Sequence, residues 1–302
     1  MLIVRFIQNL AAKACVGVLA QSGELRPLDV EHLSDLLTET VQGARRIVES
    51  PGPAVPMGQY RLLPPVDGLT EVWASGVTYR RSRQARIEES SVKDVYSLVY
   101  DAARPELFFK SVAWRVVGDG ELVGIRCDSQ LNVPEPELAL VANAHGELFG
   151  LTICNDVSSR SIEGENPLYL PQAKIYAGAC ALGPGIRPIW EVPEPARLTI
   201  DARVQRNGTD VWSESTSTAL MHRKFEDLLE FLYRADTFPD GAVLSTGTGL
   251  VPNLEFTLHA DDVVSITIEQ IGSLTNRVSV GPGDFAILSG SLKVPHLRPS
   301  IA

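Results

Sequence analysis

Two glutamates at the head of an apolar segment offer the first chemistry. Glu135 and Glu137 are two residues apart within the strand-like stretch 133–141. Side chains alternate along a strand, so both carboxylates point to the same side, with Cα atoms roughly 6.5 Å apart. Such like charges repel unless water or a cation lies between them. The segment therefore indicates either a solvated strand edge, protected by Pro134 and Pro136, or one wall of a cation site.

A third carboxylate follows a second apolar segment. Residues 151–154 are strand-like, and Asp156 comes shortly after them, 19 residues beyond Glu137. One interpretation is that Asp156 caps the following turn. The other is that it closes a site with three carboxylates. Ligands that are all oxygen suit a hard cation, Mg²⁺ first, with Mn²⁺ and Ca²⁺ also compatible.

A lysine stands beside another apolar stretch. Lys174 precedes residues 175–182, where a lone lysine is often a side chain whose stem packs on apolar neighbours while its ammonium reaches water. Next to a metal, the same lysine would instead bind a substrate anion. The sequence leaves both interpretations open.

Four arginines cluster in this acidic chain: Arg80, Arg81, Arg83 and Arg86. One interpretation is a solvated helix start. The other is that Arg81 or Arg83 clamps a substrate carboxylate, because a guanidinium offers bidentate geometry. We expect Arg160, which follows Asp156, to order its own loop.

Strands are expected along much of the chain. Segments 2–7 and 15–19 are strand-like, and apolar residues alternate with polar ones along 198–204, 254–258 and 264–268. Asn207-Gly208 adds a strong hairpin turn signal after the third of them. With so few helices between the strands, the pattern predicts an α+β fold with β dominant, a mixed β-roll or sandwich.

Helices are expected in three places. One begins at Asp29 as N-cap and carries apolar residues over 33–41, and a second spans 79–101. A third carries apolar residues at helical spacing, namely Phe225, Leu228, Leu229 and Leu232. Five prolines within 51–65 break the chain between the first two helices. We therefore predict a small N-terminal α/β domain over 1–65 and a catalytic domain over 66–302.

Composition excludes several classes of function. The 302 residues carry a net charge of −10, so binding to nucleic acid or to an anionic membrane surface is disfavoured. No apolar run is long enough to span a bilayer. Four scattered cysteines suit a reducing cytoplasm better than a disulfide framework. Dinucleotide, P-loop and nucleophile-elbow motifs are absent from the sequence.

Seven segments in this order resemble the fumarylacetoacetate hydrolase family. They are Ala74–Tyr79, Pro105–Lys110, Glu135–Leu138, Asn155–Arg160, Lys174 with Leu182–Pro184, Leu244–Thr248 and Ile271–Asn276. Each one alone is weak, whereas their order along the chain makes the signal specific. The resemblance covers about residues 72 to 290. It implies the family's β-roll after a small N-terminal domain.

The resemblance also implies roles for particular residues. Metal ligands would be Glu135, Glu137 and Asp156, with Mg²⁺ as cofactor. Substrate contacts would come from Ser75, Lys174, and Thr246 or Thr248. Hydrolases of this family carry a histidine where this chain has Ser82. Serine without a partner is no base near neutral pH, so hydrolysis by activated water is not expected.

The serine at this position and the sequences of segments 77–83 and 161–174 resemble the branch of the family that dehydrates 2-keto-3-deoxypentonates. The implied substrate is the D-arabinonate- or D-xylonate-derived keto acid, and the product is 2-oxoglutarate semialdehyde. With C1 and C2 oxygens on Mg²⁺, the C3 protons become more acidic. Lys174 is our candidate base, provided that its pKa is depressed, and Glu106 is our candidate proton donor.

Two other functions stay open at this stage. One is a metal-dependent hydrolase or decarboxylase of acylpyruvates, and the other is a non-catalytic sugar-acid binding protein. The three carboxylates and Lys174 favour catalysis, since a binding protein has little need for a divalent Lewis acid. We also expect a cytoplasmic homodimer or homotetramer.

Overall fold

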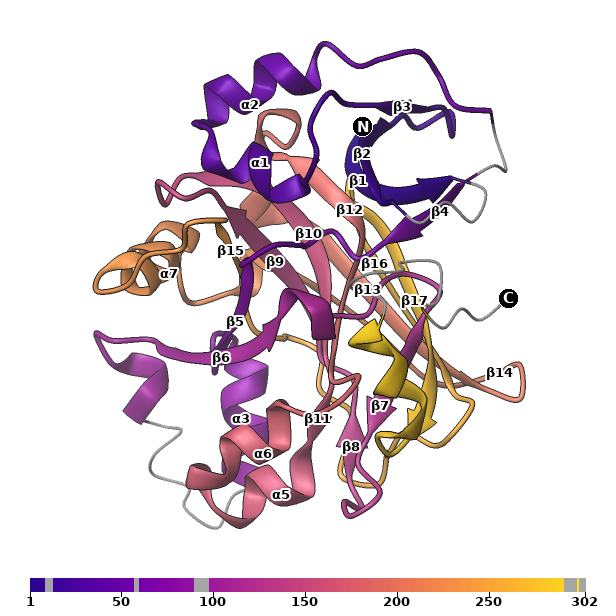
Figure 1. Ribbon diagram of the computed structural model, residues 1–302. Helices are drawn as coiled ribbons and strands as arrows, with labels where there is room; N and C mark the ends of the chain where they lie inside the picture. Colours follow the sequence, from indigo (N-terminus) through magenta and orange to yellow (C-terminus); the bar gives the residue numbers. More distant parts are fainter. Residues whose placement is uncertain (9–12, 57–59, 90–97, 291–297, 299–302) are drawn as a thin grey trace.

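Two β-sheets make up most of this computed structural model, which describes residues 1–8, 13–56, 60–89, 98–290 and 298 (Figure 1). The large sheet is mixed, and its strands follow the order β3-β2-β1-β12-β10-β9-β15-β5-β6, with β4 paired to β1. In that order the bounds are β3 (Leu25–Pro27), β2 (Cys15–Leu19), β1 (Leu2–Gln8), β12 (Cys180–Pro188), β10 (Leu148–Asp156), β9 (Pro136–Ala142), β15 (Ala242–Ser245), β5 (Glu71–Gly76), β6 (Glu106–Val112) and β4 (Tyr60–Leu63).

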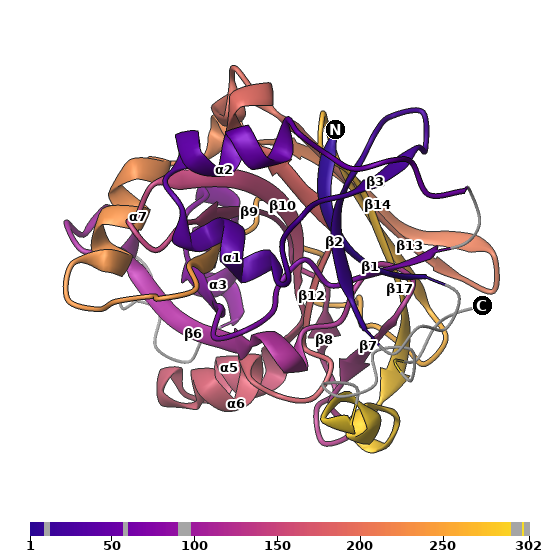
Figure 2. The same cartoon turned by 45° about the horizontal axis from the view of Figure 1, so that its top comes forward.

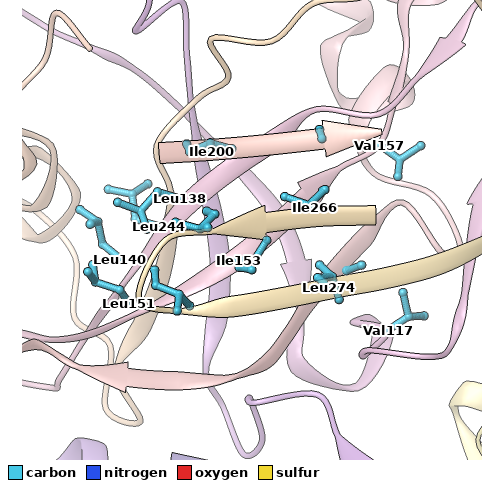
Figure 3. Close-up of a cluster of buried hydrophobic side chains, with 14 of the residues drawn as sticks. Val117, Leu138, Leu140, Leu151, Ile153, Val157, Ile200, Leu244, Ile266 and Leu274 are labelled. Atoms are coloured by element: carbon cyan, nitrogen blue, oxygen red, sulfur yellow. The ribbon is translucent and has the colours of Figure 1, made fainter. Parts of the chain in front are cut away.

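The second sheet has five strands in the order β14-β13-β16-β17-β7. They are β14 (Thr209–Ser217), β13 (Thr199–Arg206), β16 (Val263–Ile268), β17 (Gly272–Val280) and β7 (Leu122–Ile125). One face of this sheet packs on the large sheet, and their side chains form a common core (Figure 3). This core includes Leu138, Leu140 and Ile153 from the large sheet and Ile200, Ile266 and Leu274 from the small one.

The helices are short and lie around the large sheet. They are α1 (Leu33–Thr38), α2 (Val41–Val48), α3 (Arg80–Glu89), α5 (Arg160–Glu165), α6 (Leu170–Lys174) and α7 (Phe225–Tyr233). Short 3₁₀ turns are η1 (Ala113–Arg115), η2 (Pro167–Tyr169), η3 (Ile189–Glu191), η4 (Pro195–Arg197), η5 (Thr218–Leu220) and η6 (Gly283–Leu288). In Figures 1 and 2, α3, α5 and α6 gather near β6. A two-stranded ladder of β8 (Asn132–Val133) and β11 (Ser158–Ser159) lies beside α5 and α6. No helix in the described residues is long and apolar enough to cross a membrane.

Most predicted elements are confirmed, and the fold is β-dominant α+β as expected. Strands β1, β2, β13 and β16 and helix α7 form where the periodicity placed them. Asn207 and Gly208 take φ values of 52° and 78°, as the two central residues of a type I′ hairpin turn require.

Three local predictions were wrong. Residues 254–258 form no strand, because Asn253 starts a turn: its side-chain oxygen accepts from Glu255 N at 3.2 Å and its carbonyl from Phe256 N at 3.1 Å. The first helix is two helices, since Thr40 interrupts it and caps α2 through Gly43 N at 3.1 Å. The N-cap of α1 is His32 rather than the predicted Asp29.

The predicted helix over residues 79–101 is helical at both ends. Helix α3 covers Arg80–Glu89, and residues 98–101 are helical again. Residues 90–97 of that prediction lie outside the described part of the chain.

The N-terminal segment is built into the large sheet. Strand β1 pairs with β12 at Ile3 and Ile186, and the helices α1 and α2 bury Leu36 and Ala44 in one core with Phe149. The first 65 residues thus share hydrogen bonds and a core with the rest. The division at residue 65 stays a prediction.

Candidate active site

Two neighbouring strands bring three carboxylates together. Glu135 immediately precedes β9, Glu137 is its second residue, and Asp156 ends β10. Antiparallel pairing sets Glu137 opposite Cys154. One oxygen from each carboxylate lies within 4.8 Å of the other two. All three side chains are buried, with 1–3% of their surface exposed. A solvated strand edge is therefore not the role of the two glutamates.

Lys174 lies against two of these carboxylates. Its Nζ donates to Glu135 Oε2 at 2.7 Å, to Asp156 Oδ2 at 3.1 Å and to Ser158 Oγ at 2.5 Å. The side chain is buried, so its ammonium does not reach water as a snorkelling lysine would. Helix α6 ends at Lys174, whose side chain reaches Asp156 at the end of β10 and Glu135 just before β9.

The charges in this cluster shift the pKa values of its members. Burial alone would lower the pKa of Lys174, but the carboxylates of Asp156 and Glu135 outweigh it, and the pKa is raised. Burial alone would raise the pKa of Glu135, yet the charges of Lys174, Arg86 and Arg160 hold it well below its usual range. Lys174 is therefore an ammonium here, and the depressed pKa expected for a base is not found.

Glu137 has the opposite environment. Burial, and then the charges of Asp156 and Glu135, raise its pKa well above the usual range. A further positive charge at the cluster would allow all three carboxylates to be ionised together. Buried oxygen ligands of this number and charge fit a hard divalent cation such as Mg²⁺. The donor set thus fits the metal that the sequence suggested.

The carboxylates open into a narrow pocket. It is lined by Ser75, Gly76, Val77, Ser82, Arg86, Glu106, Phe108, Glu135, Glu137, Asp156, Glu163, Lys174, Gly247 and Thr248. Val77 has φ 53°, a left-handed conformation that is costly for a β-branched residue. Strain of this kind is typical of functional sites, where the surrounding structure holds it in place.

Glu106 reaches this pocket from β6. Its carboxylate packs so closely on Gly76 that a Cβ at that position would collide with it. Burial, followed by the charge of Glu163, raises the pKa of Glu106. A raised pKa favours the neutral acid, the form that can donate a proton.

Other residues expected to bind substrate differ in their placement. Ser75 and Thr248 line the pocket, but their hydroxyls donate to Glu106 O at 2.9 Å and Pro136 O at 3.0 Å. Thr246 is not among the lining residues described, and its hydroxyl donates to Leu138 O at 2.8 Å.

The two arginines expected to clamp a carboxylate point elsewhere. Arg81 Nη2 donates to Val251 O at 3.2 Å, and the Arg83 guanidinium lies over the Tyr100 ring, 5.1 Å from its centre. Neither belongs to the described pocket lining. Arg86, one turn further along α3 from Ser82, occupies the wall instead. The helical spacing of Ser82 and Arg86 is the signal that could have identified it.

The serine that replaces the family's histidine is bound by the main chain. Ser82 Oγ donates to Tyr79 O at 2.8 Å and lies 3.2 Å from Tyr79 N, from which it accepts. It lines the pocket but has no base beside it among those contacts.

A second buried lysine was missed by sequence reasoning. Lys110 Nζ donates to Lys174 O at 2.6 Å and to Val157 O at 3.2 Å, and it forms an ion pair with Asp156 Oδ1. In β6, Phe109 pairs with Trp73 and Ser111 with Val72, so Lys110 is the extra residue of a β-bulge. A bulge re-aims a side chain. The period-two spacing of Lys110 from Glu106 is the sequence signal that could have identified it.

The family model described as fumarylacetoacetate hydrolase, C-terminal, matches residues 72–279. The chain therefore belongs to the fumarylacetoacetate hydrolase family, as its seven segments suggested. Two curated relatives are dehydratases. Over 215 residues it is 49% identical to a "Probable 2-keto-3-deoxyxylonate dehydratase" of Haloferax volcanii, covering 71% of this chain and 74% of that protein. Over 222 residues it is 45% identical to a "2-dehydro-3-deoxy-D-arabinonate dehydratase" of Saccharolobus solfataricus, covering 72% and 74%.

Among solved structures, the chain is similar to a 2-keto-3-deoxy-D-arabinonate dehydratase complexed with magnesium and 2,5-dioxopentanoate. The TM-score is 0.81 at 35% identity, over 93% of this chain and 99% of that one. The expected fold is therefore confirmed over nearly the whole length.

Proposed function

We propose that this protein is a lyase, a Mg²⁺-dependent dehydratase that converts a 2-keto-3-deoxypentonate into 2,5-dioxopentanoate, also called 2-oxoglutarate semialdehyde. The observation that carries the proposal is one buried pocket in which three clustered carboxylates meet Lys174 and Glu106. The two dehydratase relatives and the magnesium- and product-bound structure support the substrate and the metal.

Glu135, Glu137 and Asp156 would hold the metal. When bound, Mg²⁺ supplies a Lewis acid that polarises the substrate's C2 carbonyl and acidifies the C3 protons. The buried, preorganised carboxylates orient the keto acid in a fixed position. Proximity of this kind is a large part of rate enhancement in enzymes.

The pocket offers a separate group for each of the two proton transfers of the elimination. Glu106, whose raised pKa favours the protonated form, would protonate the C4 hydroxyl as it leaves. Lys174 would accept a C3 proton as a neutral amine. For this, another positive charge must first take over the contacts of Lys174 with Glu135 and Asp156, because those contacts keep its pKa high. Loss of the C3 proton and the C4 hydroxyl would leave a C3–C4 double bond conjugated to the C2 carbonyl. Removal of a C5 proton then gives a dienol, and its protonation at C3 and C4 gives the C5 aldehyde.

A dehydratase also agrees better with Ser82 than a hydrolase does. Hydrolysis of an acylpyruvate needs a base that activates water, and the Ser82 hydroxyl is bound to the Tyr79 main chain. Dehydration needs no such water. The pocket wall is rich in charged and hydroxyl groups, which suits a hydroxylated sugar acid.

The test is a turnover assay with D-2-keto-3-deoxypentonate, with Mg²⁺ and separately with EDTA, following the aldehyde. We expect metal-dependent aldehyde formation. Turnover of acylpyruvates in its place would contradict the proposal in favour of a hydrolase or decarboxylase. Tight binding of the keto acid without turnover, unaffected by EDTA, would favour a sugar-acid binding protein.

Three expectations accompany this function. We propose a role in non-phosphorylative pentose catabolism, a cytoplasmic location and a homodimer or homotetramer. The four free cysteines fit a reducing compartment. Light scattering on the eluted protein measures the assembly directly, and a monomer would contradict the last expectation.

A further inference from the structure

The three clustered carboxylates share one arrangement: each has an oxygen held by the pocket wall and another left for the centre of the cluster. On the central side, Lys174 Nζ contacts Glu135 Oε2 and Asp156 Oδ2. The wall-side hydrogen-bond donors are Arg86 and Arg160 on Glu135 Oε1, and Ser245 and Gly247 on Glu137 Oε2. On Asp156 Oδ1 the wall-side partner is Lys110, which forms an ion pair with it.

Glu137 differs from the other two in how it is held. Charged side chains hold Glu135 and Asp156 on their wall sides, whereas Glu137 Oε2 accepts from Ser245 Oγ at 2.5 Å and from Gly247 N at 2.8 Å. Hydrogen bonds from a hydroxyl and a main-chain N–H to a carboxylate are charge-assisted and strong. They leave the other oxygen of Glu137 for a ligand.

Ser245 is itself rigidly placed. It is the last residue of β15 and pairs with Ala139 of β9 on one side and with Ala74 of β5 on the other. Its side chain is fully buried. A donor fixed by strand pairing on both sides can hold a carboxylate in one orientation without further loss of rotamer freedom.

We propose that Ser245 is the positioning residue for Glu137 and that its hydroxyl sets the affinity of the carboxylate cluster for divalent cations. The inference rests on the proposed function, because it concerns the metal site of that function. Groups that orient a metal ligand from behind typically change metal affinity when they are removed. Ser245 touches neither the substrate nor the metal in this role.

The first experiment compares Mn²⁺ binding to the wild type and to Ser245→Ala, with free Mn²⁺ followed by electron paramagnetic resonance. We expect the variant to bind Mn²⁺ about 10-fold more weakly. Thr152→Val is the matched control. Thr152 is also fully buried, on β10 of the same sheet, but its hydroxyl donates to the Gly183 carbonyl at 3.3 Å. This control should keep the wild-type affinity.

A second pair of variants separates the effect of the hydroxyl on Mn²⁺ affinity from the effect of side-chain packing. Ser245→Thr and Ser245→Val have the same shape, and only the threonine keeps the donor. We expect threonine to restore Mn²⁺ affinity and valine to leave it weakened. Thermal unfolding of the metal-free proteins shows whether each variant is folded, and the threonine–valine comparison holds even if both lose stability.

The outcomes distinguish this inference from the proposed function. A wild-type protein that binds no divalent cation would remove the metal site, and with it the proposed function. Metal binding by the wild type with equal affinity in Ser245→Ala would overturn the role of Ser245 alone. Equal weakening in Ser245→Ala and Thr152→Val would overturn it too, because general packing would then be the cause.

Discussion

Lys174 balances two of the three clustered carboxylates by direct contact, and this explains why so much charge can be buried. Its ammonium lies 2.7 Å from Glu135 Oε2 and 3.1 Å from Asp156 Oδ2. A buried ion pair is costly unless its hydrogen bonds are satisfied, and Ser158 Oγ satisfies another of its protons. At the scale of single residues, the site is an electrostatic arrangement that a divalent cation would complete.

The assigned proton donor and base can be separated by experiment. We expect Glu106→Gln to lower the dehydration rate by about 10²- to 10⁴-fold, because it removes the acid that assists the C4 hydroxyl. Exchange of the C3 protons with deuterated water should continue in this variant, since Lys174 is intact. Proton NMR of the substrate measures both processes.

Lys174→Met is the counterpart of that variant. It should lose the C3 exchange together with dehydration, whereas metal-bound protein is still formed. Wild-type turnover by Glu106→Gln, or C3 exchange that persists in Lys174→Met, would contradict the assigned roles.

At the scale of elements, Lys110 joins three parts of the fold. From the bulge in β6, its ammonium reaches the end of β10 through Asp156, the next residue Val157, and the last carbonyl of α6 at Lys174. The carbonyls at the end of a helix lack intrahelical partners, so a cation there is favourable. This side chain thus ties α6, and with it Lys174, to β10.

We predict that Lys110→Met lowers the free energy of unfolding by about 3–5 kcal/mol, because it breaks a buried ion pair of Asp156 and removes the donor to the buried Val157 and Lys174 carbonyls. Urea denaturation of the metal-free protein measures this. Lys13→Met is the control, since the pair of Lys13 with Glu31 is exposed and should leave stability unchanged. Similar midpoints for both variants would show that Lys110 is not important for stability.

The β13–β14 hairpin gives another prediction at this scale. Gly208 has φ 78°, and no described atom lies within 4 Å of a Cβ built there. Gly208→Ala should therefore destabilise by about 1–2 kcal/mol through backbone conformation alone. Gly283→Ala has similar open space without a left-handed φ and should not destabilise. Chemical denaturation compares the two, and equal effects would contradict the argument.

At the scale of the whole molecule, the site lies where distant parts of the chain converge. The ligands come from β9 and β10, their supports from β6, β15, α3 and α5, and Ser245 is 108 residues from Glu137 in sequence. The site therefore exists only in the folded protein. A ligand that binds only the folded state stabilises it by mass action.

Metal removal tests this coupling. We expect Mg²⁺ at 100 times its dissociation constant to stabilise the protein by about 2.7 kcal/mol relative to EDTA. The thermal midpoint should rise accordingly in differential scanning calorimetry. In Asp156→Asn the Mg²⁺-dependent rise should disappear, whatever the variant's own midpoint. A rise that survives in this variant would place the cation elsewhere.

The sequence by itself determined several of the strands and the orientation of the paired glutamates. Alternation with period two places Glu135 and Glu137 on one side of a strand, and it also predicted β13, β16 and the Asn207-Gly208 turn. These features depend on neighbours along the chain. The order of seven short segments was enough to indicate the family that the comparisons show.

Only the tertiary structure decided which charged groups meet the carboxylates. Arg86 contacts Glu135 across 49 residues and Lys110 reaches Val157 across 47, while Arg81 and Arg83 on the same helix as Arg86 point elsewhere. The direction in which a helix face points, and the side chain that a bulge re-aims, follow from packing between distant elements. Local spacing can place Arg86 on the helix face of Ser82 and Lys110 on the strand face of Glu106, but it does not say which carboxylates those faces meet. These partners therefore appear only when the sheets and helices are assembled.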